Sequence, residues 1–386
     1  MTQWNDRKNT APGSKPMILI NPNSGINRDL PNLGLAYIAT IKDSKVIDLN
    51  TKREPKERYL KETDNEVLIS IRSSALNESK IIRKEYKKKH KNARIRSVTG
   101  VIDVQCCYPN IGFEKNIVIK NEFNDKLAFP KYELFDSFDL FKKHWANGTW
   151  AYPVMTSLGC PFQCIYCASR NRPVKYRSPE NCYEEIKSAI EKYGIKSFQI
   201  IDDCFNVNNN RVLEFCKLVK PLGLKWFCTN GLRADLFNEA QAKAISESGC
   251  KQISFGIESL DKKVLINIKK GLSVEKFKES IRIAKRYFDV VNCYFIIGLP
   301  GSTYESDLKN VNWVKSAGVN GHFSYFVPPE METRADYTFY GDKAVPRSKE
   351  YPIELQEKIY KMTQSMRPYS IKHLVRRVIR KLSKLV

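Results

Sequence analysis

Long apolar runs are missing from this chain of 386 residues, and histidine is scarce, with four residues. No run approaches the roughly 20 apolar residues that a membrane-spanning helix needs. Residues 1–15 are polar and lack the apolar core of a secretion signal, which predicts a cytoplasmic protein. Acidic residues are also few, because 42 Asp and Glu face 65 Lys and Arg and leave a formal net charge of +23. The basic excess favours phosphate-bearing partners, either RNA or lipid headgroups.

The basic residues gather in two stretches. Residues 80–96 hold nine basic residues and one acidic residue, and residues 367–386 hold seven basic residues and no acidic one. Within the second stretch, residues 371–386 alternate apolar and basic side chains at helical spacing, which predicts a basic amphipathic helix. Two interpretations stay open: this helix lies in a membrane interface at the inner face of the membrane, or it packs on the protein with a solvated basic face.

Cysteine is the residue whose spacing is most informative. The eleven cysteines are an odd number in a chain without a secretion signal, which indicates a reducing compartment and no disulfides. Cys160, Cys164 and Cys167 have the spacing C-x₃-C-x₂-C, with no fourth cysteine at a matching distance. A structural zinc site would need that fourth ligand, whereas three thiolates on a [4Fe–4S] cluster leave one iron open for a substrate or cofactor. Cysteines at or near later strand ends are predicted to be small core residues: Cys204, Cys228, Cys250 and Cys293.

After the cysteine run, short apolar stretches alternate with longer amphipathic ones. Helices are predicted between the strands, and this order indicates a parallel sheet with helices outside. The predicted strands are 152–156, 196–201, 224–228, 252–257, 291–297 and 322–327, and the predicted helices are 211–219, a stretch around residues 240–245, 274–287 and 304–317. Polar residues follow the strands, at the positions where barrels of this kind place their chemistry.

The run SLGCPFQCIYCAS, residues 157–169, resembles the cluster loop of radical S-adenosylmethionine (SAM) enzymes. The resemblance implies that Cys160, Cys164 and Cys167 hold a [4Fe–4S] cluster and that SAM binds the open iron. Reduction of that complex would cleave SAM to methionine and a 5′-deoxyadenosyl radical. Tyr166 fills the place of the aromatic residue that precedes the third cysteine in this family, and we predict a catalytic role for it. The six predicted strands fit the family's fold, a partial (β/α)₆ barrel of the TIM type.

Strand-end residues match the same family in kind, and the resemblance implies their roles. Asp202 and Asp203 would accept hydrogen bonds from the amino group of SAM, and Arg233 would face its carboxylate. Glu258, in the run GIES, would meet SAM or substrate and is predicted to be catalytic and cofactor-binding, since an unused buried carboxylate is costly. Gly298 would let adenine approach the backbone. The alternatives are a loop or capping role for the two aspartates and a surface position for Arg233.

Residues 1–135 have a pattern of their own. Predicted strands at 17–22, 45–49, 66–71 and 98–104, with helices at 33–41 and from residue 76, indicate a small doubly wound, Rossmann-like α/β domain. The pattern resembles the N-terminal cobalamin-binding domain of class B radical SAM proteins. It departs from them because the lower-ligand motif D-x-H-x-x-G is absent and the usual glycine pair near the fourth strand is reduced to one glycine. Cobalamin binding and a scaffold without cofactor therefore both stay open.

The predicted domain organisation is a Rossmann-like domain at 1–135, a linker at 136–150, a radical SAM core at 151–335 and a C-terminal extension at 336–386. The resemblance implies an enzyme that modifies an unreactive carbon of a lipid or small molecule, by methyl transfer if cobalamin is bound. It also implies a reductase of the flavodoxin or ferredoxin kind as electron donor. The alternatives are an RNA-modifying radical SAM enzyme, which the charge favours, and a non-catalytic iron–sulfur protein.

Overall fold

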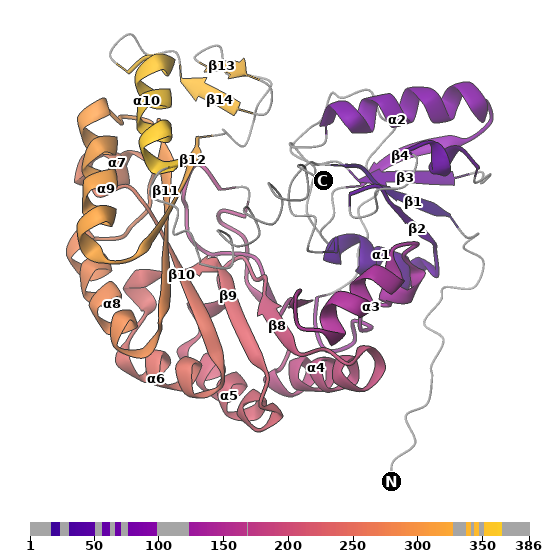
Figure 1. Cartoon of the computed structure of the whole chain (residues 1–386), viewed down its shortest axis with the longest axis horizontal. Helices are drawn as coiled ribbons and strands as arrows, with labels where there is room; N and C mark the ends of the chain where they lie inside the picture. The colour runs from indigo at the N-terminus through magenta and orange to yellow at the C-terminus, as the bar shows by residue number, and fades with distance from the viewer. Residues whose placement is uncertain are drawn as a thin grey trace, which may run out of the picture.

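The computed structural model describes two α/β units that lie side by side (Figure 1). The described residues are 17–23, 31–50, 56–61, 66–70, 76–98, 123–167, 169–326, 337–340, 343–346 and 351–364. The amphipathic helix predicted at 371–386 lies outside them. Across these residues, no helix combines the length and the apolar character that a bilayer crossing requires.

The larger unit is built on a six-stranded sheet in the order β12-β11-β10-β9-β8-β5, with every neighbouring pair parallel. The sheet curves with its helices on the outer side, which confirms the predicted partial (β/α)₆ barrel (Figure 1). Its strands are β5 (Tyr152–Val154), β8 (Ser197–Ile200), β9 (Lys225–Leu232), β10 (Cys250–Glu258), β11 (Val290–Ile297) and β12 (Asn320–Tyr325).

Each outer helix begins at a polar side chain that accepts a backbone N–H of the first turn, which satisfies one of the donors left open there. The capping residues are Ser178, Asn208, Asn238, Asp261, Ser273 and Thr303. The helices that follow them are α4 (Pro179–Tyr193), α5 (Asn209–Val219), α6 (Glu239–Glu247), α7 (Lys262–Asn267), α8 (Val274–Tyr287) and α9 (Tyr304–Ala317). The sequence analysis predicted neither α4 nor α7.

Short 3₁₀ segments occupy some of the connections. They are η1 (Lys56–Lys61), η3 (Tyr132–Leu134), η4 (Phe205–Val207), η5 (Lys220–Leu222) and η6 (Ala234–Leu236). The segment predicted as a linker, 136–150, contains the helix α3 (Phe138–Ala146).

The smaller unit contains a four-stranded parallel sheet in the order β2-β1-β3-β4, as expected for a doubly wound domain. Its elements are β1 (Ile18–Asn21), α1 (Leu33–Lys42), β2 (Val46–Asp48), β3 (Glu66–Ser70), α2 (Leu76–Lys89) and β4 (Arg94–Val98). A fourth strand was predicted near 98–104, whereas the described strand β4 begins at Arg94 and meets that prediction at Val98. Residues 99–104 lie outside the described ones.

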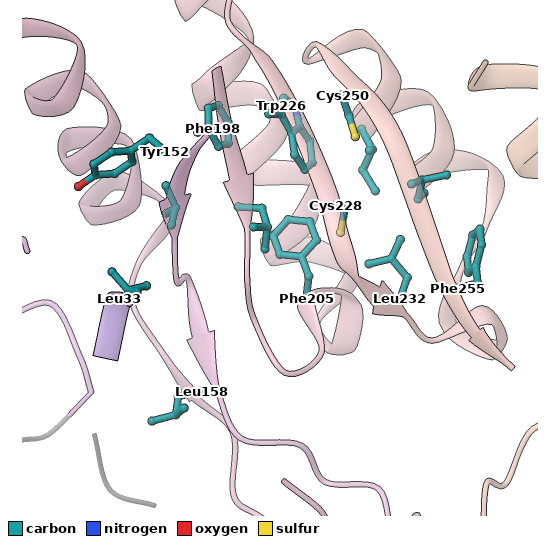
Figure 2. Packing of buried hydrophobic residues seen from close by; sticks show 14 of the residues in the cluster. Leu33, Tyr152, Leu158, Phe198, Phe205, Trp226, Cys228, Leu232, Cys250 and Phe255 are labelled. Atoms are coloured by element: carbon teal, nitrogen blue, oxygen red, sulfur yellow. The ribbon is translucent and has the colours of Figure 1, made fainter. Parts of the chain in front are cut away.

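Alternate residues of the smaller sheet face two different cores, as the pleat of a strand dictates. Ile18 and Ile20 of β1 belong to a separate core with residues of α2, whereas Leu19 belongs to the large core shared with the barrel. The helix α1 lies on the shared side. Figure 2 shows Leu33 of α1 near Tyr152 of β5, in the cluster that also contains Trp226 of β9. The two units therefore share one continuous apolar core.

A buried ion pair also joins the two units. The guanidinium of Arg177 pairs with Glu185 of α4, and both side chains are 1% exposed. Arg177 Nη1 also donates to the hydroxyl of Tyr37 in α1, at 3.4 Å, and to the carbonyl of Met155, at 3.1 Å. Because a buried charge is costly unless it is paired, this contact fixes α1 against the start of the barrel.

The C-terminal extension covers the far edge of the barrel. An antiparallel pair, β13 (Tyr337–Tyr340) and β14 (Lys343–Pro346), precedes the helix α10 (Ile353–Gln364). Ile359 of α10 and the preceding Tyr351 pack with Ile297 of β11 and Val311 of α9 in a third apolar cluster. The extension thereby reaches the end of β11.

Candidate functional site

The cysteine loop is closed at its base by two short antiparallel strands, β6 (Ser157–Leu158) and β7 (Lys175–Tyr176). Gly159 enters the loop with φ of +98°, and a Cβ there would lie 2.4 Å from the carbonyl oxygen of Pro173. Only glycine therefore fits this position. Hydrogen bonds from the amide of Arg172 to the carbonyl of Cys160, 2.9 Å, and from Asn171 to Phe162, 2.8 Å, tie the two sides of the loop together.

All three loop cysteines are free thiols, and Cys164 is the most buried of them. A hydrogen bond with the thiol of Cys204 is the main cause that lowers the pKa of Cys160 to about 7, whereas burial raises the pKa of Cys167 to about 11. Among the described residues, no three His, Cys, Asp or Glu side chains are arranged to hold a single metal ion. A set of soft thiol donors alone, in one short loop, fits an iron–sulfur cluster.

Cys204 is a neighbour that the sequence analysis missed. It was predicted to be a small core residue, and it is indeed 2% exposed. Its thiol nevertheless contacts Cys160, one of the predicted cluster ligands. The sequence offered one indication of this contact. Cys204 directly follows Asp202 and Asp203, which come after β8 and were predicted to lie at the site.

Asp203 fastens the cysteine loop at both ends. Its Oδ2 accepts from the amide of Gly159 at 2.8 Å, and its Oδ1 accepts from the hydroxyl of Ser169 at 2.7 Å. These two partners directly precede the first cysteine and closely follow the third. Hydrogen bonds to a carboxylate are stronger than neutral ones, so Asp203 holds the loop over the end of β8.

Asp202 has a different environment, although its neighbour was predicted to share its role. It is 1% exposed. Its oxygens accept from the amide of Thr156 at 2.6 Å, from the Thr156 hydroxyl at 2.5 Å and from the hydroxyl of Ser157 at 2.7 Å. Burial raises the pKa of this carboxyl above its ordinary value. The structure therefore makes Asp202 a support for the strand that leads into the cysteine loop.

Glu258, Lys270 and Tyr166 form a buried triad. Lys270 Nζ donates to Glu258 Oε1 at 3.0 Å and to the Tyr166 hydroxyl at 2.8 Å, and that hydroxyl lies 3.1 Å from Glu258 Oε1. The side chains of Lys270 and Glu258 are 7% and 9% exposed. Burial, followed by the Glu258 charge, raises the pKa of Tyr166 well above its ordinary value. The structure thus brings together Tyr166 and Glu258, which were both predicted to be site residues. Lys270, to which the sequence analysis assigned no role, bonds to both of them.

The backbone at the end of β10 is shaped for this triad. Glu258 has φ of +71°, which is unusual for a residue with a side chain, and it follows an irregularity in the pairing of β10 with β11. A Cβ on Gly256 would lie 2.7 Å from Glu258 Oε1 and 3.4 Å from Lys270 Nζ. Gly256 therefore makes room for the ion pair. Strain of this kind, about 1–3 kcal/mol, persists where the surroundings hold it, commonly at functional sites.

Arg233 bridges the cysteine loop and the segment after β10. It is 5% exposed and makes two hydrogen bonds with Asp235, both 2.8 Å. Its Nη1 donates to the carbonyl of Lys270 at 2.7 Å, and its guanidinium lies 3.8 Å from the ring centre of Phe162. Arg233 is thus a buried residue beside the loop, and the alternative of a surface arginine was wrong.

Gly298 lies at the end of β11, with φ of +76°. Its amide donates to Asp307 Oδ2 at 3.1 Å, and the hydroxyl of Tyr351 donates to the same oxygen at 2.8 Å. Burial raises the pKa of Asp307 to about 7. A Cβ on Gly298 would lie 2.5 Å from Oε1 of Gln356, a buried acceptor without a partner in the described part of the chain. Residues of the C-terminal extension therefore shape the predicted adenine-binding turn.

The comparison with protein families gives one match to this region. Residues 154–327 match the model of the radical SAM superfamily. The match begins at the end of β5, includes the three loop cysteines and the triad, and ends just after β12.

Solved structures show a similar fold that extends beyond the matched segment. The methyltransferase TsrM from Kitasatospora setae, solved with tryptophan and a SAM analogue, covers 92% of this chain and 89% of its own, with a TM-score of 0.67 at 13% identity. The cobalamin-dependent SAM radical enzyme OxsB covers 92% of this chain and 56% of its own, with a TM-score of 0.56 at 14% identity. At these identities the likeness concerns the fold, with the N-terminal unit included.

Curated relatives share more sequence with the chain but are longer. An uncharacterised methyltransferase of Pyrococcus horikoshii is 32% identical over 199 residues, which are 51% of this chain and 42% of that protein. Cytidylyl-2-hydroxyethylphosphonate methyltransferase of Streptomyces wedmorensis is 26% identical over 220 residues, 53% of this chain and 41% of that protein. The chain thus spans about two fifths of the length of these relatives. Over residues 154–327 the chain is therefore similar to the radical SAM superfamily.

Proposed function

We propose that this protein is a radical SAM enzyme in which Cys160, Cys164 and Cys167 hold a [4Fe–4S] cluster. The observation that carries the proposal is the way the three free thiols are presented. They lie in a loop that Asp203 fastens at both ends and that Tyr166 ties to the Glu258–Lys270 pair. Three ligands would leave one iron for SAM, and the bound cluster would supply the electron for reductive cleavage of SAM to methionine and a 5′-deoxyadenosyl radical.

The side chains around the loop would position SAM and keep water away. Asp203 and Arg233 hold the loop, Glu258 offers a carboxylate at the end of β10, and Gly298 forms the turn after β11 at which adenine would bind. In this arrangement Tyr166 and Lys270 hold the Glu258 side chain in place. Predicted contacts between SAM and Asp203, Arg233, Glu258 or Gly298 belong to this proposal.

We further propose methyl transfer with the help of cobalamin, which would carry the methyl group. The likeness in fold to TsrM, described with cobalamin and a [4Fe–4S] cluster bound, includes the N-terminal unit and supports this outcome. The methyltransferase relatives support it as well. The site would be the crevice beyond β1 and β3, where ligands of doubly wound sheets bind.

The polar side chains at that crevice fit an uncharged, hydrogen-bonding ligand. Asn32 Nδ2 donates to Asn21 Oδ1 and to Ser70 Oγ, both at 3.3 Å, and Asn21 and Ser70 are the last residues of β1 and β3. His90 is the histidine of the N-terminal unit. It contacts the carbonyl of Leu60 and precedes β4, so it lies at the opposite end of the strands from the crevice. Cobalamin bound here would have no histidine ligand from the described residues.

The substrate we propose is a small molecule or lipid, and the electron donor is a flavodoxin- or ferredoxin-type protein. Two further points stay predictions from the charge pattern. One is membrane contact through residues 371–386, which lie outside the described residues, and the other is RNA as a substrate. A test of RNA as substrate would compare retention of the protein on RNA and on liposomes across a salt series.

Anaerobic turnover tests the proposed function. The protein is reconstituted with iron and sulfide and given SAM and dithionite, with hydroxocobalamin present or absent, and 5′-deoxyadenosine and S-adenosylhomocysteine are quantified. We expect 5′-deoxyadenosine from the wild type and none from Cys164→Ala. Formation of S-adenosylhomocysteine only when cobalamin is present would support methyl transfer. Formation of 5′-deoxyadenosine with no S-adenosylhomocysteine, even with cobalamin, would contradict methyl transfer but not SAM cleavage. Absence of both products would contradict the proposal.

A further inference from the structure

A surface cleft of about 750 Å³ lies directly beside the cysteine loop. One wall is formed by Pro161, Phe162 and Gln163, the residues between the first two cysteines. The other wall comes from residues between 262 and 275, which run from α7 to the first turn of α8. Anything seated in this cleft would touch the loop that carries the predicted cluster ligands.

The rim of the cleft is apolar at one point and basic around it. Ile266 of α7 is 75% exposed, and Ile81 of α2 is the other large apolar side chain exposed in the described part of the chain. A single exposed apolar side chain is ordinary on a protein surface, so Ile266 supports the argument only together with the cleft and the charges around it. Lys262 and Lys269, which line the cleft, are exposed, and so is Lys263, which follows Lys262 on α7.

Acidic groups near this rim cancel only part of its charge. Glu275 pairs with Lys262 at 3.0 Å, and both side chains are exposed. Asp261 uses one oxygen to cap α7, accepting from the amides of residues 263 and 264 at 2.8 and 3.2 Å. Lys270 lines the cleft but is paired with Glu258 in the triad. With Lys262 and Lys270 paired, the cleft keeps a small positive excess from Lys269 and the neighbouring Lys263, beside the apolar Ile266.

We propose that this cleft is the docking surface for a small acidic protein that carries single electrons. The inference rests on the proposed function, because reductive cleavage of SAM consumes one electron per turnover. One electron leaves the reduced carrier, which is oxidised, and enters the cluster, which passes from the 2+ to the 1+ state. Complementary charge speeds such encounters, and complexes that transfer electrons bury small interfaces, below about 1,200 Å².

A second basic surface among the described residues, on α2, is in the wrong place for this role. The helix α2 carries exposed lysines at positions 84, 88 and 89. It packs on the face of the smaller sheet that does not share the barrel core, away from the barrel in Figure 1. A carrier bound at α2 would be separated from the cysteine loop by the whole N-terminal unit. The α2 surface therefore offers a matched control.

Reduction kinetics test the proposal. Reconstituted protein is mixed anaerobically with a bacterial flavodoxin in its hydroquinone form, or with dithionite, and cluster reduction is followed by absorbance. In Lys262→Glu/Lys263→Glu/Lys269→Glu, we expect the second-order rate constant with flavodoxin to fall about tenfold or more at low salt. Ile266→Ser should also lower it. Dithionite is small and needs no docking surface, so its rate should stay the same in every variant.

The control variant is Lys84→Glu/Lys88→Glu/Lys89→Glu, which changes the net charge by the same amount and should retain the flavodoxin rate within about twofold. Equal losses in both triple variants would overturn the proposal, because the effect would then come from total charge. An unchanged rate in the cleft variant would also overturn it. Failure of dithionite to reduce the wild type would instead contradict the proposed function.

Binding to the cluster-free protein gives a second readout. Titration with oxidised flavodoxin, followed by calorimetry or NMR, should give a salt-dependent complex with the wild type and the α2 control. The cleft variants should bind at least about tenfold more weakly. SAM affinity, measured on the reconstituted proteins, should be the same in all of them, and a loss of SAM binding in the cleft variant would assign the cleft to the SAM site and overturn the docking role.

Discussion

The carboxylate of Asp203 accepts a hydrogen bond from the amide of Gly159 at 2.8 Å. The contact joins the end of β8 to the residue that precedes the first cysteine. The second oxygen holds Ser169, beyond the third cysteine, at 2.7 Å. One side chain thus fixes both ends of the cysteine loop, which makes the loop a preorganised ligand set.

Replacement of Asp203 should weaken the hold on the cluster without unfolding the protein. In Asp203→Ala both hydrogen bonds are lost, and because Asp203 is exposed to solvent each bond contributes about 1 kcal/mol. We expect iron to be removed by a chelator roughly tenfold faster or more, measured by absorbance. The control is Asp125→Ala, which removes a similar 2.7 Å bond to the amide of Ser178, outside the loop. Equal iron loss in both variants would contradict the role of Asp203.

We expect that alanine at Gly159 is not tolerated, because its Cβ would clash with the backbone. Gly223 serves as a comparison, because its backbone conformation is similar but no such clash exists there. Gly159 and Gly223 both have positive φ, but a Cβ on Gly159 would lie 2.4 Å from Pro173 O, whereas nothing lies within 4 Å of a Cβ on Gly223. Gly223→Ala should cost about 1–2 kcal/mol of unfolding free energy, the cost of the backbone conformation alone. Gly159→Ala should also lose cluster iron. Normal iron content in Gly159→Ala would contradict the geometry of the loop.

Removal of one charge of the Glu258–Lys270 pair should lower the free energy of unfolding more than removal of both charges. Lys270→Met leaves a buried carboxylate without its cation, which typically costs about 3–5 kcal/mol. Glu258→Gln/Lys270→Met removes both charges, so its loss should be smaller than the sum of the two single losses. Urea unfolding of the four proteins measures this coupling. Additive losses would show that the two side chains do not interact across 3.0 Å.

The pH dependence of stability should contain a contribution from Asp307. Burial raises its pKa from 3.8 to about 7, so the folded protein keeps a proton that the unfolded chain releases. Its contribution is fully present below pH 3.8, falls as the pH rises, and is lost by about pH 7. The change amounts to up to about 4 kcal/mol. In Asp307→Asn this slope should disappear from urea unfolding measured between pH 4 and 8, and an unchanged slope would contradict the assignment.

The sequence was sufficient where the signal is local. The cysteine spacing, the strand-end positions of Asp203 and Glu258, and the helix 304–317, which the structure reproduces as Tyr304–Ala317, all depend on short segments. The edge strand β4 was predicted too far along the chain, because Arg94 and Arg96 interrupt its apolar character. Edge strands commonly carry such charges, which hide them from a search for apolar runs.

Contacts between distant segments could not be predicted in the same way. No role was predicted for Lys270, because its bond to Tyr166 joins residues 104 positions apart. The distinction between Asp202 and Asp203 depends on which of the two neighbours turns toward Thr156 and which toward Gly159. Tyr351 lies outside the resemblance altogether, and only the fold brings it to Asp307.

The most direct test of the central claim is electron paramagnetic resonance of the reduced, reconstituted protein before and after SAM is added. The account predicts a [4Fe–4S]⁺ signal in the wild type whose g values shift when SAM binds the open iron, and no such signal in Cys164→Ala. A signal that SAM leaves unchanged, in a protein with a full complement of iron, would contradict the assignment of this loop to SAM cleavage.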